Sequence, residues 1–304
     1  MRKQKNSINY TKREEKRAYW ILVLPGVIIY YAIMAFPTIF SVVLSLSNYQ
    51  GGPLFGNRTP FEIVGFKWYA NLFKDEYFYI ALKNNIKIVA VSLFGQIPLG
   101  FFLAYILHRG MVKAKTFFQT MIYLPCVIST VVIGILWKSF FAPYGAFPEL
   151  MRLFNPAYET QLSSHPMVPV LFVIFWMYTG TYLIIFLANL QKINSSILEA
   201  AKIDGASEMQ LLKYIILPAL SGVIVTSCIL AISGSLKSFD LIYVMTSGGP
   251  ANRTTVLSLY MFDKAFKGAP KYPLANAIST VMVVISFILI LITMKLEKTF
   301  GGRE

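Results

Sequence analysis

Few residues in this chain could carry out bond-making chemistry. The histidines are His108 and His165, and the cysteines, Cys126 and Cys228, lie within long apolar segments. A free cysteine in such surroundings packs like a small hydrophobic residue. The sequence has no Gly-Lys dipeptide, and therefore no phosphate-cradling Walker loop, and no His-Glu-x-x-His zinc motif. We therefore expect no catalytic residue, no metal site and no cofactor on this chain.

The most regular polar pattern is a pair of helix-start signals in residues 194–218, which read NSSILEAAKIDGASEMQLLKYIILP. Ser196 and Glu199 have the spacing of a capping box, which would start a helix at Ile197. Gly205 suits the left-handed position that ends a helix. The first half of this segment is therefore predicted to be a short helix closed by a glycine.

A second capping box follows at Ser207 and Gln210, and its helix would run to Pro218. The pattern predicts a helix–glycine–helix elbow whose first helix offers a mostly small apolar surface. Two interpretations of the elbow remain open on the residues alone. It could be a docking site for another protein, or an amphipathic hairpin without a partner.

The elements that must position this elbow are apolar and long. The composition is 56% apolar and 14% charged, where a soluble domain carries about 25% charged residues. About 20 helical residues cross a ~30 Å hydrocarbon layer, and the shortest charge-free window here has 20. The windows without Asp, Glu, Lys, Arg or His are 18–57, 88–107, 116–137, 166–191, 214–236 and 272–294.

Each window is predicted to be one transmembrane helix, which gives six. The first is counted as a single span, 18–46, because its second half is polar and contains Gly51-Gly52-Pro53. A cleaved signal peptide fits this window poorly, since a signal core has only ~7–15 apolar residues and is followed by a small-residue cleavage site.

Basic residues indicate the orientation. The segments 1–17, 108–115, 192–213 and 295–304 hold 16 Lys and Arg in 57 residues, and the other connecting segments hold 12 in 93. The positive-inside rule therefore places both termini and the elbow in the cytoplasm. The net charge of +14 is explained by this topology, so we expect no nucleic-acid partner.

The elbow also carries a family resemblance. Glu199-Ala200-Ala201, Gly205, Ile215 and Leu217-Pro218 match the spacing EAA-x3-G-x9-I-x-L-P at seven positions over 20 residues. This resembles the signature of the inner-membrane permease subunits of bacterial ABC importers. Weaker similarities cover about residues 60–300 and are closest to the first permease of the maltose, multiple-sugar and glycerol-3-phosphate branch. They lie at Gly65-Phe66, at Lys83-Asn84-Asn85, and from Ser238-Phe239-Asp240 to Gly248-Gly249-Pro250.

The resemblance implies an all-α integral membrane protein with the type I ABC importer fold and six transmembrane helices. It divides the chain into a basic tail (1–17), a first helix (18–46), an external loop (47–83), a transmembrane core (84–295) and a second tail (296–304). The elbow, 192–217, would be the coupling element that docks on an ATPase. The coupling residues it implies are Glu199, Ala200, Ala201, Asp204, Gly205, Ala206, Ile215, Leu217 and Pro218.

A sugar offers hydroxyl groups and apolar ring faces, so its transport site should combine aromatic and hydrogen-bonding side chains near the midplane. The resemblance places such contacts in the fourth and fifth spans. For Tyr178 and Tyr182, an interfacial aromatic belt or helix packing is an equally physical interpretation. The candidates are Met177, Tyr178, Thr181, Tyr182, Gly234, Ser235, Ser238 and Asp240.

The implied partners are a second, different permease chain, a cytoplasmic ATPase dimer that holds ATP and Mg²⁺, an external binding protein and a carbohydrate, all at the bacterial cytoplasmic membrane. A polyol phosphate, peptide or amino acid is the alternative substrate. A secondary transporter would need ion-coupling carboxylates within the spans, and a membrane enzyme would need clustered His, Asp or Cys. The six windows contain no carboxylate.

Overall fold

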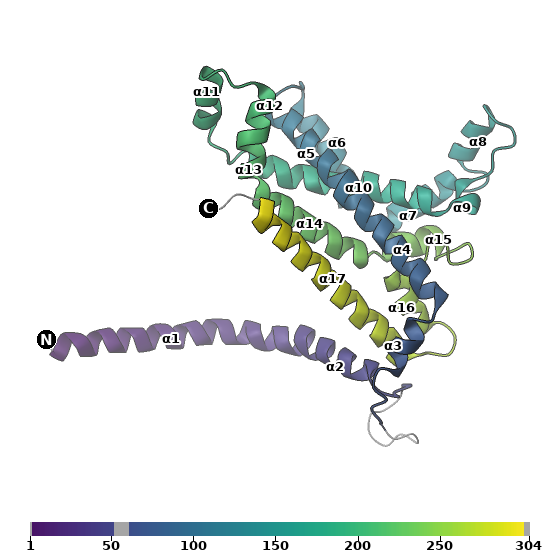
Figure 1. Cartoon of the computed structure of the whole chain (residues 1–304), viewed down its shortest axis with the longest axis horizontal. Coiled ribbons are helices and arrows are strands. Elements are labelled where there is room, and N and C mark those ends of the chain that lie inside the picture. Colours follow the sequence, from purple (N-terminus) through teal and green to yellow (C-terminus); the bar gives the residue numbers. More distant parts are fainter. Residues whose placement is uncertain (1, 52–60, 301–304) are drawn as a thin grey trace.

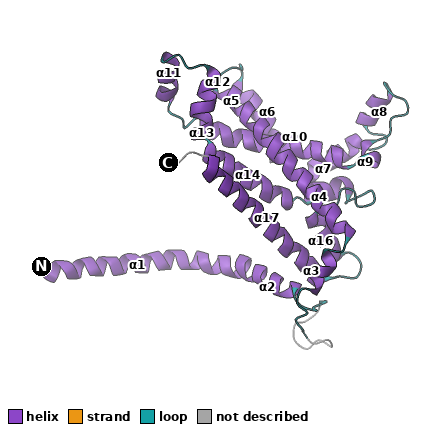
Figure 2. Ribbon diagram, in the orientation of Figure 1, coloured by secondary structure: helices purple, strands orange, loops and turns teal. Residues whose placement is uncertain are grey.

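Helices account for all regular structure in the part of the chain that the computed structural model describes, residues 2–51 and 61–300 (Figure 2). One isolated antiparallel bridge joins Ser47 to Ile63. The helices are α1 (Arg2–Tyr30), α2 (Phe36–Ser45), α3 (Lys67–Leu72), α4 (Glu76–Val91), α5 (Ile97–His108), α6 (Lys115–Val127), α7 (Thr130–Phe141), α8 (Ala146–Arg152), α9 (Gln161–Ser164), α10 (Met167–Leu190), α11 (Ser195–Ile203), α12 (Glu208–Leu211), α13 (Leu217–Ala219), α14 (Ser221–Leu236), α15 (Asp240–Thr246), α16 (Leu257–Phe266) and α17 (Tyr272–Phe300), with π-helical segments at Tyr31–Ala35, Ser92–Gln96 and Leu212–Ile216.

Within those residues, five helices are long and apolar enough to cross a membrane, and a sixth candidate is a bent pair. In the bent pair, Glu208–Ala219 and Ser221–Leu236 meet at 65°. The sequence prediction of six spans therefore holds if the bent pair counts as one span. The five others are Glu14–Ser45, Glu76–His108, Thr130–Arg152, Met167–Leu190 and Tyr272–Lys295.

The window 116–137 is not the single helix that the sequence predicts. It is divided between α6 and α7, because Ile128 and Ser129 have extended ψ values of 143° and 128°. Pro125 lies in the last turn of α6 and lacks the N–H that the helix needs there. Serine favours the first capping position of a new helix. Hydropathy alone does not detect such a break, because the residues on both sides are apolar.

Each π-helical segment is followed directly by a proline in the next helix. The prolines are Pro37, Pro98 and Pro218. A proline ring in an α-helix clashes with the carbonyl four residues before it. The wider π-helical turn moves that carbonyl away from the ring. Its hydrogen bonds join residues five apart, such as the bond from the amide of Ile97 to the carbonyl of Ser92. The prolines thus explain why these helices widen without ending.

The long helices lie side by side with their ends in two groups (Figure 1). Helix α10 packs against α5 and α6, while α17 packs against α14 and α2. The start of α1, the end of α17 and the elbow helix α11 lie toward one end of the molecule. Helices α8, α9, α15 and α16 lie toward the other. This arrangement agrees with an even number of crossings between the two ends of the chain.

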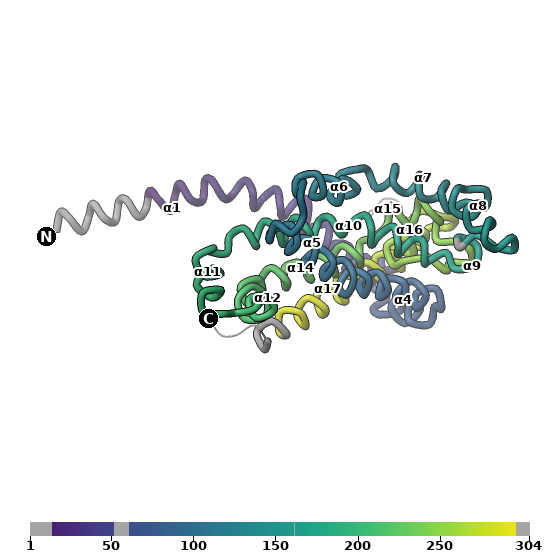
Figure 3. Tube along the Cα trace, turned by 90° about the horizontal axis from the view of Figure 1, so that it is seen from above, coloured from purple at the N-terminus to yellow at the C-terminus, as the bar shows by residue number. Residues whose placement is uncertain are grey.

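Helix α1 stands apart from the bundle (Figures 1 and 3). None of the most apolar stretch of Glu14–Ser45 is buried against the rest of the chain. Only its far end, α2, contacts α17, where the Ser41 hydroxyl donates to Asn276 Oδ1 at 2.5 Å. The N-terminal span is therefore attached at one end and has no protein neighbour along most of its length within the described residues.

Among the described residues, three clusters of buried apolar side chains hold the bundle together, and the third includes Leu72, Phe78 and Ile278 of α3, α4 and α17. The first includes Ile88, Met167 and Ile174 and lies toward the end that carries α8 and α9. The second includes Leu183 and Ile216 and lies toward the elbow. Between lipid tails and helices there is little hydrophobic driving force, so close packing carries much of the association energy.

Close packing requires glycine where α10 crosses its neighbours. A Cβ on Gly180 would lie 2.8 Å from Tyr123 Cα on α6. A Cβ on Gly100 would lie 2.6 Å from Tyr182 Cβ on α10. Both contacts are with atoms that cannot move without moving the helix, so these crossings depend on the missing side chain.

We predict that Gly180→Ala forces α6 and α10 apart and lowers the free energy of unfolding by about 1–3 kcal/mol, the usual cost of overpacking. Denaturation of the purified chain in detergent measures this change. Gly26→Ala is the matched control, because a Cβ there meets no atom within 4 Å. Equal stability of the two variants would show that the crossing tolerates a methyl group.

Candidate functional site

The first helix of the elbow, α11, begins two residues earlier than the sequence predicts. Its N-cap is Asn194, whose Oδ1 accepts the backbone N–H of Ser196 at 3.0 Å and the Ser196 hydroxyl at 2.8 Å. The predicted capping box of Ser196 and Glu199 is therefore wrong. Asn194 has the extended ψ of 119° that an N-cap needs, and it engages the serine hydroxyl itself. The side chain of Glu199 is left exposed.

The predicted glycine stop is confirmed. Gly205 has φ +85°, in the left-handed region where a Cβ is costly. The amide of Ala206 donates to the carbonyl of Ala201 at 2.9 Å, and the amide of Gly205 donates to that of Lys202 at 3.0 Å. These two bonds form a Schellman motif. The angle between α11 and α12 is thus fixed by backbone bonds as well as by side chains.

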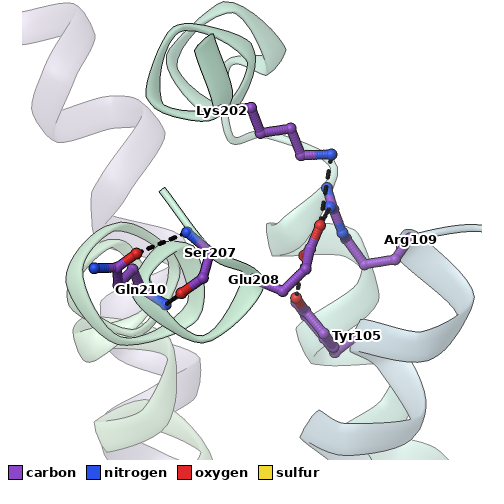
Figure 4. Close-up of polar contacts among 6 residues, drawn as sticks. All are labelled: Tyr105, Arg109, Lys202, Ser207, Glu208 and Gln210. Carbon is purple, nitrogen blue, oxygen red and sulfur yellow. Dashed lines mark hydrogen bonds and ion pairs between the residues drawn. The ribbon is translucent and has the colours of Figure 1, made fainter. Parts of the chain in front are cut away.

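The second predicted capping box is also confirmed. The amide of Ser207 donates to Gln210 Oε1 at 2.7 Å, and the amide of Gln210 donates to the Ser207 hydroxyl at 3.4 Å (Figure 4). Helix α12 continues through the widened turn Leu212–Ile216 into α13. The elbow therefore passes without a loop into the bent fifth span.

A polar cluster joins the elbow to the end of α5. Glu208 on α12 pairs with Arg109, accepts the Tyr105 hydroxyl at 3.1 Å and lies 3.5 Å from Lys202 Nζ (Figure 4). The Arg109 side chain is 15% exposed, so water screens this pair less than a surface pair. Glu208 therefore links α11, α12 and α5. The sequence does not single out this residue, because Tyr105 and Arg109 lie about a hundred positions away from it.

Six of the coupling residues predicted from the sequence lie on α11 and in its Schellman turn, and the other three lie about ten residues further on, where the widened turn leads into α13. Glu199 and Ala200 are exposed on α11, Ala201 is half-buried, and Leu217 and Pro218 begin α13. The remaining four are Asp204, Gly205 and Ala206 of the turn, and Ile215. All four line a hollow of about 300 Å³, together with Gln210 and Tyr214. Apolar side chains flank the turn, with Ile203 86% and Met209 70% exposed. Such a patch at the end of a bundle is typical of a protein interface.

A cavity of about 370 Å³ lies halfway along the long helices. It is lined at the centre of Glu76–His108 by Ser92 and Gln96, and at the centre of α10 by Tyr178. It lies where the first and second of the three apolar clusters meet, because Ile88 and Ile174 of the first and Tyr182 and Ala231 of the second all line it. This depth corresponds to the middle of a membrane.

Most of the substrate candidates from the sequence line this cavity. Met177 does not: it is 1% exposed within the apolar packing, and its carbonyl accepts the Cys126 thiol at 2.7 Å. Its side chain packs in the first apolar cluster, which includes Ile88 of α4, Ile133 of α7 and Leu241 of α15. The candidates at the cavity are Tyr178, Thr181, Tyr182, Gly234, Ser235, Ser238 and Asp240.

Sequence reasoning missed three polar residues of the cavity wall, Ser92, Gln96 and Thr130. Gln96 is 1% exposed and donates to the carbonyl of Ile174 at 2.7 Å. Ser92 and Ser235 share a hydrogen bond at 3.2 Å. A lone amide within an otherwise apolar window was the available signal for Gln96. Burying such a group is costly unless a second helix supplies its partner.

The lining of the cavity combines polar and apolar groups. Its formal charges, Lys237 and Asp240, cancel, and the described lining residues include no histidine or cysteine. Hydroxyl groups and a buried amide accompany tyrosine rings, which together suit a neutral ligand with both hydroxyls and apolar faces. The cavity and the elbow at one end of the bundle are the two features of this chain that the comparisons below bear on.

The comparisons with known proteins identify the family. Residues 96–300 match the family model described as "Binding-protein-dependent transport system inner membrane component". The chain therefore belongs to this family, and it is a multi-pass membrane permease subunit of the ABC importer type.

Curated relatives cover nearly the whole chain. The lactose transport system permease protein LacF of Rhizobium radiobacter is 33% identical over 89% of this chain and 90% of its own length. The multiple sugar-binding transport system permease protein MsmF of Streptococcus mutans is 32% identical over 95% of this chain and 99% of its own. The trehalose transport system permease protein SugA of Mycobacterium tuberculosis is 31% identical over 92% of this chain and 90% of its own length.

Solved structures share the fold. A chain of a bacterial ABC transporter that imports the acidic polysaccharide alginate superposes with a TM-score of 0.78 at 22% identity, covering 96% of this chain and 99% of its own. A chain of the MetNI methionine ABC transporter superposes with a TM-score of 0.52 at 14% identity, covering 73% of this chain and 95% of the MetNI chain. At these identities the similarity concerns the fold alone.

We predict that Glu208→Gln loosens the elbow without unfolding the bundle. Loss of the carboxylate removes the ion pair with Arg109, worth about 1 kcal/mol for a partly exposed pair. Amide hydrogen exchange of residues 195–211 should then accelerate about fivefold. Glu149→Gln removes a comparable pair with Arg152 at the opposite end and should leave this exchange unchanged. Unaltered exchange in Glu208→Gln would show that the Schellman turn alone holds the elbow.

Proposed function

We propose that this chain and a second, different permease form the path by which a carbohydrate crosses the bacterial cytoplasmic membrane. An external binding protein delivers the carbohydrate, and a cytoplasmic ATPase dimer, which holds ATP and Mg²⁺, drives the transport. The observation that carries the proposal is the pairing of a neutral, hydroxyl-lined cavity at mid-depth with a rigid docking elbow at one end.

A carbohydrate is favoured by the chemistry of the cavity. Tyr178 presents a ring, 37% exposed, that can stack on a sugar face. Ser238, Thr181 and the Asp240 carboxylate offer hydrogen-bonding groups on other walls. The names of three curated relatives, which concern lactose, multiple sugars and trehalose, support the same class. A phosphorylated polyol would meet no net positive charge here, so it is less suited to the cavity.

Coupling to an ATPase is favoured by the elbow. A movement of a partner against α11 would pass through the Schellman turn into α12 and through Glu208 into α5. Helix α5 is continuous with the segment that supplies Ser92 and Gln96 to the cavity. Rigid elements therefore connect the docking surface to the cavity, which is the requirement for a subunit that hydrolyses no nucleotide itself.

The second permease is favoured by the position of α1. This apolar span diverges from its own bundle (Figure 1), and none of its most apolar stretch is buried against the described residues. A homologous bundle would cover this stretch with close contacts. Two permeases would also present two elbows, one for each subunit of an ATPase dimer. We place the elbow and both termini in the cytoplasm, because the segments at that end carry the higher density of Lys and Arg.

Gly205→Val tests the coupling elbow. Valine at positive φ costs about 1–2 kcal/mol, so the Schellman turn should rearrange and displace the docking surface. We expect ATP-driven uptake into proteoliposomes that contain both permeases, the ATPase dimer and the binding protein to fall at least tenfold.

The control is Gly268→Val, which has φ +67° at the opposite end and no atom near its Cβ position. It should retain uptake within a factor of two. Uptake that persists without the ATPase, or that survives Gly205→Val unchanged, would contradict the coupling proposal.

Tyr178→Phe tests the cavity. Loss of one hydrogen bond to the solute, about 0.5–1.5 kcal/mol, should raise the sugar concentration for half-maximal uptake roughly 2–10-fold. Tyr243→Phe is the control, because Tyr243 is also 37% exposed but does not line the cavity. The same assay measures both variants, and an equal response would remove Tyr178 from the path.

A further inference from the structure

A second hollow of about 450 Å³ opens at the end of the bundle opposite the elbow, and its charges are all positive. We name it the cationic pocket and define it by Lys83, Lys87, His165 and Arg253. The two lysines are on α4, His165 lies between α9 and α10, and Arg253 lies in the loop before α16. None of the described residues that line the pocket is acidic. Three separate segments therefore bring basic side chains together without compensation.

The buried side chain of Asn84 organises this cluster. It is 2% exposed, and its Nδ2 donates to the carbonyl of Arg253 at 2.8 Å and to that of Thr255 at 2.9 Å. Its Oδ1 accepts the Lys87 ammonium at 3.1 Å. One amide thus fixes the backbone of Arg253 and the head group of Lys87. The cations are placed by the interior of the fold and not by chance on its surface.

The basic groups keep most of their capacity for a ligand. No ion pair found among the described residues includes Lys83, Lys87 or Arg253. The carboxylates of Asp75, Glu149 and Asp263 each have another cation as partner. A lysine has three donors and an arginine five, and Lys87 uses one on Asn84 while Arg253 uses one on the carbonyl of Ser164 at 3.4 Å. Carboxylates are the matching acceptors.

The central cavity indicates that these carboxylates do not belong to the transported solute. The charges of the cavity, Lys237 and Asp240, cancel. The carboxylates of a polyanion that moved from the cationic pocket into the cavity would therefore be left without cationic partners. Buried apolar side chains of one cluster, among them Met167 and Ile88, lie between the cationic pocket and the cavity. Lys83, His165 and Arg253 are exposed at the surface of the bundle end. The ligand therefore stays outside.

We infer that the cationic pocket receives an acidic surface of the external binding protein and steers that protein onto the entrance above the cavity. This inference rests on the proposed function, because it places the pocket on the external side. Opposite charges at an interface raise the association rate and fix the orientation of the partners. The acidic side chains would pair with Arg253 in bidentate fashion and with the two lysines as point charges.

The test uses the complete complex in nanodiscs with the binding protein that supports uptake in the assay above. The measurement is the binding-protein concentration that half-maximally stimulates ATP hydrolysis. The triple variant Lys83→Gln/Lys87→Gln/Arg253→Gln should raise this concentration about tenfold at low salt, the combined effect of three exposed pairs. In the wild type, this half-maximal concentration should rise with salt, because salt screens the charges of the pocket. In the triple variant the rise should be smaller, because those charges are gone.

The control neutralises three exposed lysines in or beside α3 and just before α17, Lys67→Gln/Lys74→Gln/Lys271→Gln, which lie outside the pocket. It should behave like wild type. Equal half-maximal concentrations and salt dependence in all three complexes would overturn the inference while ATP-driven uptake, and with it the proposed function, stands. A second outcome would also overturn the inference. If only the pocket variant loses uptake of a uronate oligosaccharide, while its response to the binding protein is unchanged, the cations bind an acidic solute.

Discussion

The structure depends on two adjacent asparagines that satisfy backbone groups where helices end inside the bundle. Asn85 is fully buried; its Nδ2 donates to the carbonyl of Ser235 at 2.9 Å, and its Oδ1 accepts the amide of Leu257 at 2.8 Å. It thereby joins the end of α14 and the start of α16 to α4. At membrane depth no water can satisfy such groups. Asn84 does the same for the loop that carries Arg253. The wall of the cavity and the cationic pocket are both positioned by this pair.

Much of the architecture could be predicted from the sequence, because burial in a membrane leaves a strong compositional signal. Charge-free windows located the spans, and Gly205, Ser207 and Gln210 marked the elbow through local backbone rules that need no tertiary contact. The break at Ile128–Ser129 escaped prediction because the residues on both sides of it are apolar. The cap at Asn194 escaped prediction because Asn194 and Ser196 are both good capping residues, and the spacing of Ser196 and Glu199 favoured the serine. The roles of Glu208, Gln96 and Asn85 could not be predicted from spacing. Each acts through a partner about 80 to 170 positions away.

The elbow and the cavity are connected through the same helices that carry the packing. Gly180 and Gly100 let α6 and α5 approach α10 closely, so a shift of one helix cannot be absorbed by loose side chains. Close-packed elements move as bodies and not by gradual deformation. The 65° bend between α13 and α14 and the widened turn before it are the points at which the fifth span departs from a straight rod. The elbow enters the bundle there.

The widened turn Ser92–Gln96 has a consequence for the rotational phase of the helix that contains it. Ala81 and Ala104 are both fully buried, although they are 23 residues apart in one helix. At about 100° per residue they would point roughly 140° apart on an unbroken α-helix. A π-turn absorbs one residue with almost no added rotation, which reduces the difference to roughly 40°. The single extra residue therefore keeps both halves of the helix Glu76–His108 facing the same side, so that Asn84 and Asn85 at one end and Gly100 near the other can serve one core.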